Sequence, residues 1–143
     1  MKPVLARTLI LSMLAAAPSL AEEPLPLPTQ PDETYHAFVA PDGIQHVAIV
    51  GGNYFFRPNR VIVKAHVPVE LGVTLERGIV PHSLVIDAPE AGIQVDEKLG
   101  TEVRKIRFTP TATGSYPFYC RNKLLFLKSH RAKGMEGILE VVE

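Results

Sequence analysis

The sequence of 143 residues contains one cysteine, Cys120, no tryptophan and no excess of either charge. A single cysteine excludes an internal disulfide and any site within one chain that needs several thiolates. Fifteen Lys and Arg residues balance fifteen Asp and Glu residues. The overall charge therefore gives no case for nucleic-acid binding or for attraction to an anionic membrane surface. With 46% hydrophobic and 21% charged residues, the composition is that of one globular domain.

No apolar run is long enough to span a bilayer, but a short one lies near the start of the chain. Lys2 and Arg7 form a basic start, and the apolar run Leu9–Ala17 follows. Small residues then lead to Ala21. This order predicts a Sec-type export signal, residues 1–21, cleaved after Ala21. The run is well short of the roughly 20 residues that an anchor helix needs, so we expect no stable membrane insertion after cleavage. The predicted location is the periplasm.

The rest of the chain divides into a tether and a domain. Residues 22–33 carry four prolines and no periodic pattern, which predicts an extended tether. Residues 34–143 are expected to form the folded domain, and no internal repeat is present in them. Eight short β-rich runs separated by turn residues lie in this part of the sequence: Tyr35–Val39, Ile44–Val50, Val61–Ala65, Val69–Leu75, Ser83–Ile86, Glu102–Phe108, Ser115–Tyr119 and Gly137–Val142.

About eight short strands at this spacing predict an all-β fold, a Greek-key β-sandwich or barrel. No window shows a sustained helical period. The best helical candidates are one or two turns around Glu90–Val95 and Asn122–Ser129.

The last 30 residues carry the strongest chemical signal. Cys120 ends an aromatic strand, His130 follows after nine residues, and Met135 follows after four more. Upstream, His82 immediately precedes an apolar strand. In an oxidising exported space, a lone cysteine is buried and inert, joined to a partner, or held as a thiolate by a metal. A thiolate, two imidazoles and a weak thioether are the ligand set of a mononuclear blue-type copper site.

From about Asn53 to Glu143 the chain resembles the cupredoxins, the family of small blue copper proteins. The motifs that carry the resemblance are Tyr54-Phe55-Phe56-x-Pro58, Pro81-His82-Ser83-Leu84-Val85-Ile86, Thr113-Gly114-Ser115-Tyr116-x-Phe118-x-Cys120 and His130-x₄-Met135-x-Gly137. The resemblance implies one type-1-like copper ion with His82, Cys120 and His130 as equatorial ligands and Met135 as the axial ligand. It also implies a backbone amide of Ser83 near the thiolate, and one-electron transfer between redox partners rather than enzymatic catalysis.

Two other functions remain open from the sequence. One is a periplasmic copper-binding or delivery protein that supplies an oxidase under assembly. The other is a metal-free domain that interacts through the segment Leu124–Leu127. A dinuclear copper site is excluded because it needs a second cysteine, and multicopper oxidases need more domains and further histidine clusters.

The nine residues between Cys120 and His130 depart from simple cupredoxins, which place only a few residues there. This insert is basic and apolar, and its Leu124–Leu127 run has two interpretations. It folds over the end of the sandwich as a short helical turn and buries its side chains, or it is an exposed patch where a redox partner docks beside His130. The three other histidines, His36, His46 and His66, are expected to be ordinary strand or turn residues.

Overall fold

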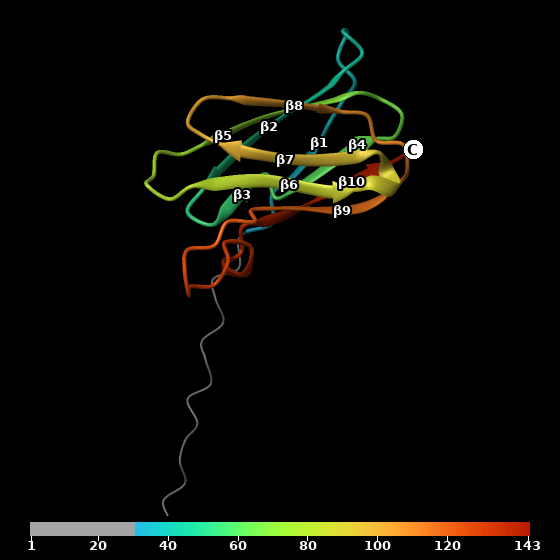
Figure 1. Cartoon of the computed structure of the whole chain (residues 1–143). Helices are drawn as coiled ribbons and strands as arrows, with labels where there is room; N and C mark the ends of the chain where they lie inside the picture. The colour runs from blue at the N-terminus through green and yellow to red at the C-terminus, as the bar shows by residue number, and fades with distance from the viewer. Residues whose placement is uncertain (1–30) are drawn as a thin grey trace, which may run out of the picture.

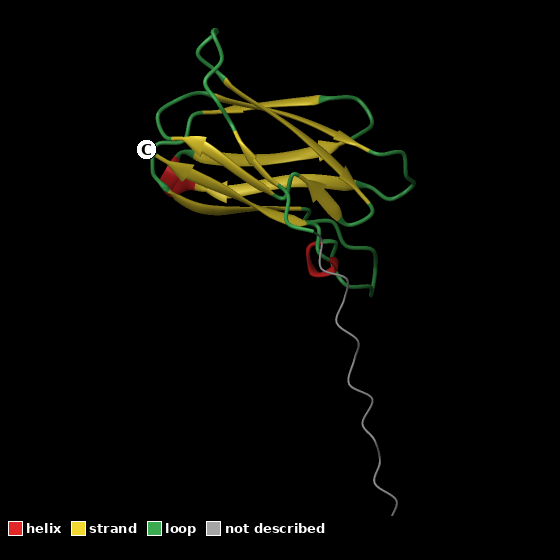
Figure 2. Cartoon of the chain, turned by 180° about the vertical axis from the view of Figure 1, so that it is seen from behind, coloured by secondary structure: helices red, strands yellow, loops and turns green. Residues whose placement is uncertain are grey.

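A computed structural model of the protein describes residues 31–143, which form a sandwich of two β-sheets (Figure 1). Their strands are β1 (Thr34–His36), β2 (Gln45–Gly52), β3 (Phe55–Arg57), β4 (Arg60–Lys64), β5 (Val69–Leu75), β6 (His82–Ala88), β7 (Ile93–Leu99), β8 (Arg104–Phe108), β9 (Gly114–Tyr119) and β10 (Glu136–Val142). Two single 3₁₀ turns complete the list, η1 (Pro89–Ala91) and η2 (Arg131–Lys133). Figure 2 shows how little of this part of the chain is helical. The predicted all-β sandwich is confirmed.

The larger sheet has the order β1-β4-β10-β9-β6-β7, and the smaller one has the order β3-β2-β5-β8. In the larger sheet β10 pairs with β4 in parallel and with β9 antiparallel, so three segments far apart in sequence lie side by side. Strand β6 lies between β9 and β7, with Ile86 opposite Phe118. This order brings the start of β6 next to the end of β9.

Period-two alternation explains why these sequences form a sandwich. Along β2, Val47 and Ile49 are buried while His46, Ala48 and Val50 are exposed, because successive side chains of a strand point to opposite faces. The inward side chains of both sheets form one core, in which Phe56 of β3 meets Phe118 of β9 edge to face at 5.6 Å between ring centroids. Each fully buried aliphatic or aromatic side chain stabilises the fold by about 1.5–3 kcal/mol.

The structure contains two strands that the sequence analysis did not expect, β3 and β7. The segment Glu90–Val95 was expected to be a helical turn, but only the 3₁₀ turn η1 forms there. Gly92, with φ +68°, ends that turn, and β7 begins at Ile93. The second half of β7, Asp96–Lys98, is charged and lies at the edge of the sheet. The alternation of apolar and polar residues that indicates a strand is therefore absent there. The second helical candidate, Asn122–Ser129, forms no helix, and η2 begins only after it.

The N-terminal predictions fall largely outside the described residues. This applies to the export signal, residues 1–21, and to residues 22–30 of the tether. The first strand begins at Thr34. Just before it, the side-chain oxygen of Asn59 accepts a hydrogen bond from the backbone N–H of Glu33 at 2.8 Å. Within residues 31–143, no helix has the length and apolarity that crossing a bilayer requires.

The two ends of the sandwich carry different segments. At one end lie the β2–β3 turn, the β5–β6 loop and the long β9–β10 segment, which is the orange and red loop projecting from the sandwich in Figure 1. The hairpin before β2 lies at the other end, where Ala65 donates a backbone hydrogen bond to Val142, the last residue of β10. All four expected ligands belong to segments at the first end.

Candidate metal centre

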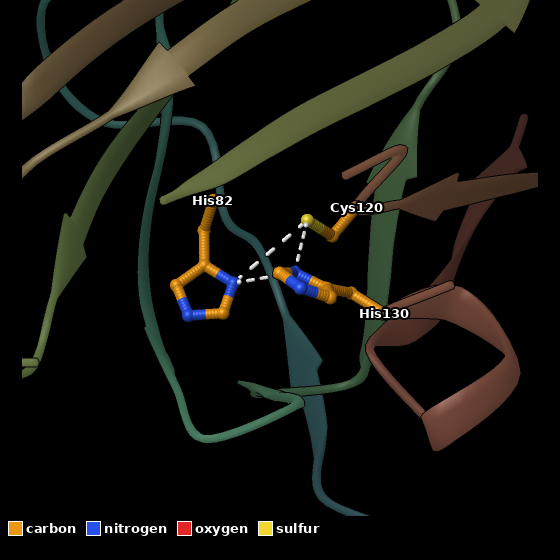
Figure 3. Close-up of side chains that lie close together, drawn as sticks. All are labelled: His82, Cys120 and His130. Atoms are coloured by element: carbon orange, nitrogen blue, oxygen red, sulfur yellow. Dashed lines mark hydrogen bonds between the residues drawn. The ribbon is translucent and has the colours of Figure 1, made fainter. Parts of the chain in front are cut away.

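The structure brings His82, Cys120 and His130 together (Figure 3). The Nδ1 atoms of the two histidines are 3.1 Å apart. The Sγ atom of Cys120 is 3.4 Å from Nδ1 of His130 and 3.8 Å from Nδ1 of His82. In Figure 3 the two rings and the thiol point toward one another. Each residue therefore offers one donor atom to a common point.

Three separate features of the backbone position these donors. His82 is the first residue of β6, and Cys120 directly follows β9, the strand beside it. His130 precedes η2 and is held from both sides, because its N–H donates to the carbonyl of Asn122 at 2.9 Å and its carbonyl accepts from Met135 N–H at 3.0 Å. Neighbouring strands of the larger sheet thus position two of the ligands, and backbone hydrogen bonds to Asn122 and Met135 position the third.

The sulfur of Cys120 has hydrogen-bonding neighbours besides the histidines. The backbone N–H of Ser83 donates to Sγ at 3.4 Å, as the sequence analysis expected. The Ser83 hydroxyl accepts from Arg121 N–H at 3.2 Å, which joins β6 to the residue after the cysteine. The thiol itself donates to the amide oxygen of Asn122 at 3.5 Å, a neighbour that the sequence analysis did not identify. Hydrogen bonds to a ligating sulfur stabilise the thiolate and tune the redox potential of a metal site.

Tyr54 and Lys133 cover the two histidines. The Tyr54 ring meets His130 edge to face at 5.0 Å and His82 at 6.3 Å between ring centroids. The ammonium of Lys133 lies 4.3 Å from the centre of that ring and donates to its hydroxyl at 3.2 Å. His130 is only 2% exposed, so its ring has no open surface edge. Tyr54 belongs to the motif Tyr54-Phe55-Phe56-x-Pro58, but the spacing of that motif from the histidines in the sequence did not indicate that its ring lies over them.

Burial has an electrostatic consequence for both histidines. Desolvation lowers the pKa of His82 below its usual value, and the neighbouring His130 lowers it further. Desolvation also lowers the pKa of His130, with an added contribution from Lys133. Both rings are therefore held neutral, which is the form that binds a metal.

The spacing of the three donors fits a single transition-metal ion. Bonds of about 2.0–2.1 Å to imidazole nitrogen and about 2.3 Å to thiolate sulfur allow donor atoms to be at most about 4.1 Å (N to N) and 4.4 Å (N to S) apart. The observed 3.1, 3.4 and 3.8 Å are all shorter than these limits. The mixture of soft sulfur and imidazole suits copper in both of its common oxidation states.

Met135 follows His130 by five residues in the sequence, and its side chain is wholly buried. Its carbonyl accepts a hydrogen bond from Cys120 N–H at 3.0 Å, which fixes its backbone beside the cysteine. Its side chain packs against the end of β2, since a Cβ placed on Gly51 would lie 3.4 Å from Met135 Cε. The axial role of its sulfur stays a prediction.

The remaining histidines lie away from this cluster. His36 and His66 are exposed. His46 contacts two carboxylates on the smaller sheet, Asp42 at 2.7 Å and Glu70 at 3.6 Å. Among residues 31–143, His82, Cys120 and His130 form the one group of three or more His, Cys, Asp or Glu side chains close enough to hold an ion.

The structure shows that the Leu124–Leu127 run is exposed, whereas docking of a redox partner on it stays a prediction. Leu127 N–H donates to the Leu124 carbonyl at 2.9 Å and Leu125 has φ +46°, so the run forms a β-turn rather than a helical turn. The side chains are not buried over the sandwich: Phe126 is 100% and Leu125 79% exposed. An exposed apolar patch beside the metal centre is what the structure contains.

Comparison with known proteins shows the fold. No protein-family model and no curated protein sequence matches the chain. Among solved structures, the metal-binding domain of the Streptococcus pneumoniae Cu(I)-exporting P-type ATPase CopA matches with a TM-score of 0.59 and 24% identity, over 80% of this chain and all of that one. Reduced auracyanin from Roseiflexus castenholzii matches with a TM-score of 0.50 and 19% identity, over 68% and 97% of the two chains.

The periplasmic domain of subunit II of the Bradyrhizobium japonicum cytochrome oxidase matches with a TM-score of 0.50 and 18% identity, over 68% of this chain and 83% of that one. These structures share the cupredoxin fold. The protein is therefore a cupredoxin-fold domain with a buried His-Cys-His cluster.

The low pKa values of the two histidines predict how stability depends on pH. In the metal-free protein, the unfolded chain takes up protons on both rings as the pH falls through about 6.5, whereas the folded protein resists doing so. The free energy of unfolding should therefore be constant above about pH 7.5 and fall as the pH is lowered toward 5. Urea titrations across this range measure the slope.

The double variant His82→Gln/His130→Gln should lose most of that slope, and the exposed control His66→Gln should retain it. An equal slope in the wild type and the double variant would show that these rings are not the groups responsible.

Proposed function

We propose that the protein is an exported mononuclear copper protein that carries single electrons between redox partners. The observation that carries the proposal is the buried triangle of His82, Cys120 and His130, with donor atoms 3.1–3.8 Å apart. We infer that these three residues would hold the copper ion, with Met135 in the axial role that the family resemblance implies. The copper supplies the redox chemistry by alternating between Cu(II) and Cu(I), and the protein is expected to make or break no bond in a substrate.

The surroundings of the triangle suit this role. Cys120 and both histidines are buried, and two of them are fixed by adjacent strands, so the donor positions are set before a metal arrives. A fixed donor set changes little when the ion changes its oxidation state. The Ser83 N–H that points at Sγ holds negative charge on the sulfur without moving a proton.

Copper delivery to an oxidase under assembly is the second candidate. It is supported by the similarity to a domain whose structure contains Cu(I), from a Cu(I)-exporting ATPase. Delivery requires that the ion leave easily. Tyr54 and Lys133 cover both imidazoles, which opposes rapid release and favours the electron carrier.

Copper retention separates the two candidates. The purified protein is loaded with one equivalent of Cu(II), then reduced, reoxidised and challenged with a Cu(I) chelator. An electron carrier shows an intense visible thiolate-to-Cu(II) band that returns undiminished after each cycle. Loss of the copper to the chelator after the first reduction, with no such band at the start, would exclude the carrier and support delivery.

Replacing Met135 with leucine tests the axial ligand. The variant should keep its copper, because the equatorial donors are unchanged. Loss of a weak donor that favours Cu(II) should raise the reduction potential, by about 59 mV for each tenfold loss of preference for Cu(II). Voltammetry of the loaded protein measures the change. An unchanged potential would mean that the thioether only fills the core, as methionine often does.

We further propose that the protein works in the periplasm, where its predicted export signal would deliver it. Its redox partners would approach the end of the sandwich that carries the metal centre, near His130 and the Leu124–Leu127 run. His130 is only 2% exposed and the Tyr54 ring lies 5.0 Å from it between centroids, so we expect an electron leaving at this end to pass by way of Tyr54.

A further inference from the structure

The tip of the β9–β10 segment, Leu124–Leu127, is a convex apolar projection from the metal-bearing end of the sandwich (Figure 1). Leu124 and Leu127 are each about half exposed, and the two residues between them are almost fully exposed. All four side chains are apolar. Single exposed apolar residues are normal on a protein surface, but four in a row at a loop tip are not.

The backbone makes this choice of residues more unusual. Leu125 and Phe126 occupy the two central positions of the β-turn that Leu127 N–H closes, and Leu125 has φ +46°. Glycine, asparagine and aspartate are preferred where φ is positive, because a Cβ is disfavoured there. The sequence therefore places apolar side chains at a site where both the backbone and water favour polar or small ones. An apolar medium outside the fold would compensate for the exposure of these side chains.

The charges beside the tip indicate what kind of apolar medium it contacts. Lys123 directly precedes the tip and Lys128 directly follows it, and both are exposed. Neither lysine has an ion pair within residues 31–143, whereas Arg121 pairs with Asp96 and Arg131 pairs with Glu136. From 121 to 135 the sequence contains no acidic residue. The tip is thus an apolar projection with an uncompensated cation on each side.

We propose that the Leu124–Leu127 tip inserts reversibly into the interface of an anionic phospholipid bilayer, with Lys123 and Lys128 at the headgroups. A bilayer accepts a convex apolar tip without a matching cavity, whereas a protein partner must supply a pocket of that shape. Lysine stems extend along apolar surface while the ammonium groups reach the phosphates, so the two flanking lysines are well placed.

The balanced charge of the whole chain does not oppose this contact. At physiological salt, charges beyond about 8 Å are largely screened, so the lysines next to the tip determine the local attraction. The contact would hold the metal-bearing end of the sandwich against the membrane surface. It does not depend on the bound metal, and it can fail while the copper proposal stands.

Tryptophan fluorescence gives a direct test, because the chain has no tryptophan. The variant Phe126→Trp keeps the tip apolar and reports its surroundings. Phe38→Trp is the matched control, since Phe38 is also exposed but lies in the hairpin segment at the other end of the sandwich. Phosphatidylglycerol vesicles should shift the Phe126→Trp emission to shorter wavelengths and leave the control unchanged. Phosphatidylcholine vesicles should shift neither.

Binding measured by vesicle sedimentation should weaken by at least about tenfold in Leu125→Ser/Phe126→Ser. It should weaken by about fivefold for each of Lys123→Gln and Lys128→Gln. The proposal is overturned if anionic vesicles leave the Phe126→Trp emission unchanged, if neutral vesicles bind equally well, or if the double serine variant binds like the wild type. A shift produced by a redox partner protein but not by vesicles would make the tip a protein contact and would equally overturn it. Far-ultraviolet circular dichroism checks that each variant is folded.

Discussion

Cys120→Ser is expected to abolish the visible charge-transfer band and to weaken copper binding by more than the 10- to 100-fold that loss of an outer hydrogen-bond partner causes. The reason is that Cys120 supplies the one thiolate of the cluster, and its Sγ lies within 3.4–3.8 Å of both imidazole nitrogens. A serine hydroxyl is a hard and weakly acidic donor, so it replaces neither the soft bond to Cu(I) nor the absorption of the thiolate. Optical spectroscopy and copper titration measure the two effects.

The sandwich should survive this substitution. The new hydroxyl is buried but can accept the Ser83 N–H, which limits the loss of unfolding free energy to about 1–3 kcal/mol. Ser83→Ala is the matched control, because it leaves the donating backbone N–H in place and should keep the visible band. A variant lacking Cys120 that remains coloured with copper would refute the assignment of the thiolate.

Gly137→Ala should lower the free energy of unfolding by about 3 kcal/mol or more, the upper part of the range for overpacked cores. A Cβ at this position of β10 would lie 2.3 Å from Cζ of Phe118 and 2.4 Å from the carbonyl oxygen of Asn59. The Asn59 oxygen belongs to the backbone and accepts a hydrogen bond from Ile138 N–H at 2.8 Å, so it cannot move away freely. Urea unfolding of the metal-free protein measures the change.

Gly100→Ala is the control for this prediction. A Cβ there meets nothing within 4 Å, and substitution should change the stability little. Similar losses at both positions would show that the close approach of β10 to Phe118 and Asn59 does not limit the fold.

The sandwich could be predicted because its strands obey simple alternation and end at turn residues. The expected runs Val61–Ala65 and Val69–Leu75 correspond to β4 and β5 within one residue. Strand β3 was missed because it has only three residues. Strand β7 was missed because the charged residues Asp96–Lys98 interrupt its apolar pattern. These residues are held in a strand by antiparallel pairing with β6, which the local sequence does not reveal.

Three residues of the candidate site could be predicted from side-chain chemistry rather than from strand patterns. His82, Cys120 and His130 have side chains whose chemistry limits their roles, and their order along the chain was informative. The cover formed by Tyr54 and Lys133 could not be predicted, because it depends on how the β2–β3 turn lies over η2. The exposure of Leu124–Leu127 also depends on the folded loop, since an apolar run alone suits a buried turn equally well.

Anomalous diffraction at the copper absorption edge from crystals of the loaded protein locates the metal directly. We expect one copper peak per chain, within bonding distance of Cys120 Sγ and of Nδ1 of both His82 and His130. A peak elsewhere, for example between His46 and its carboxylate neighbours, with the sulfur of Cys120 free of metal, would contradict this expectation.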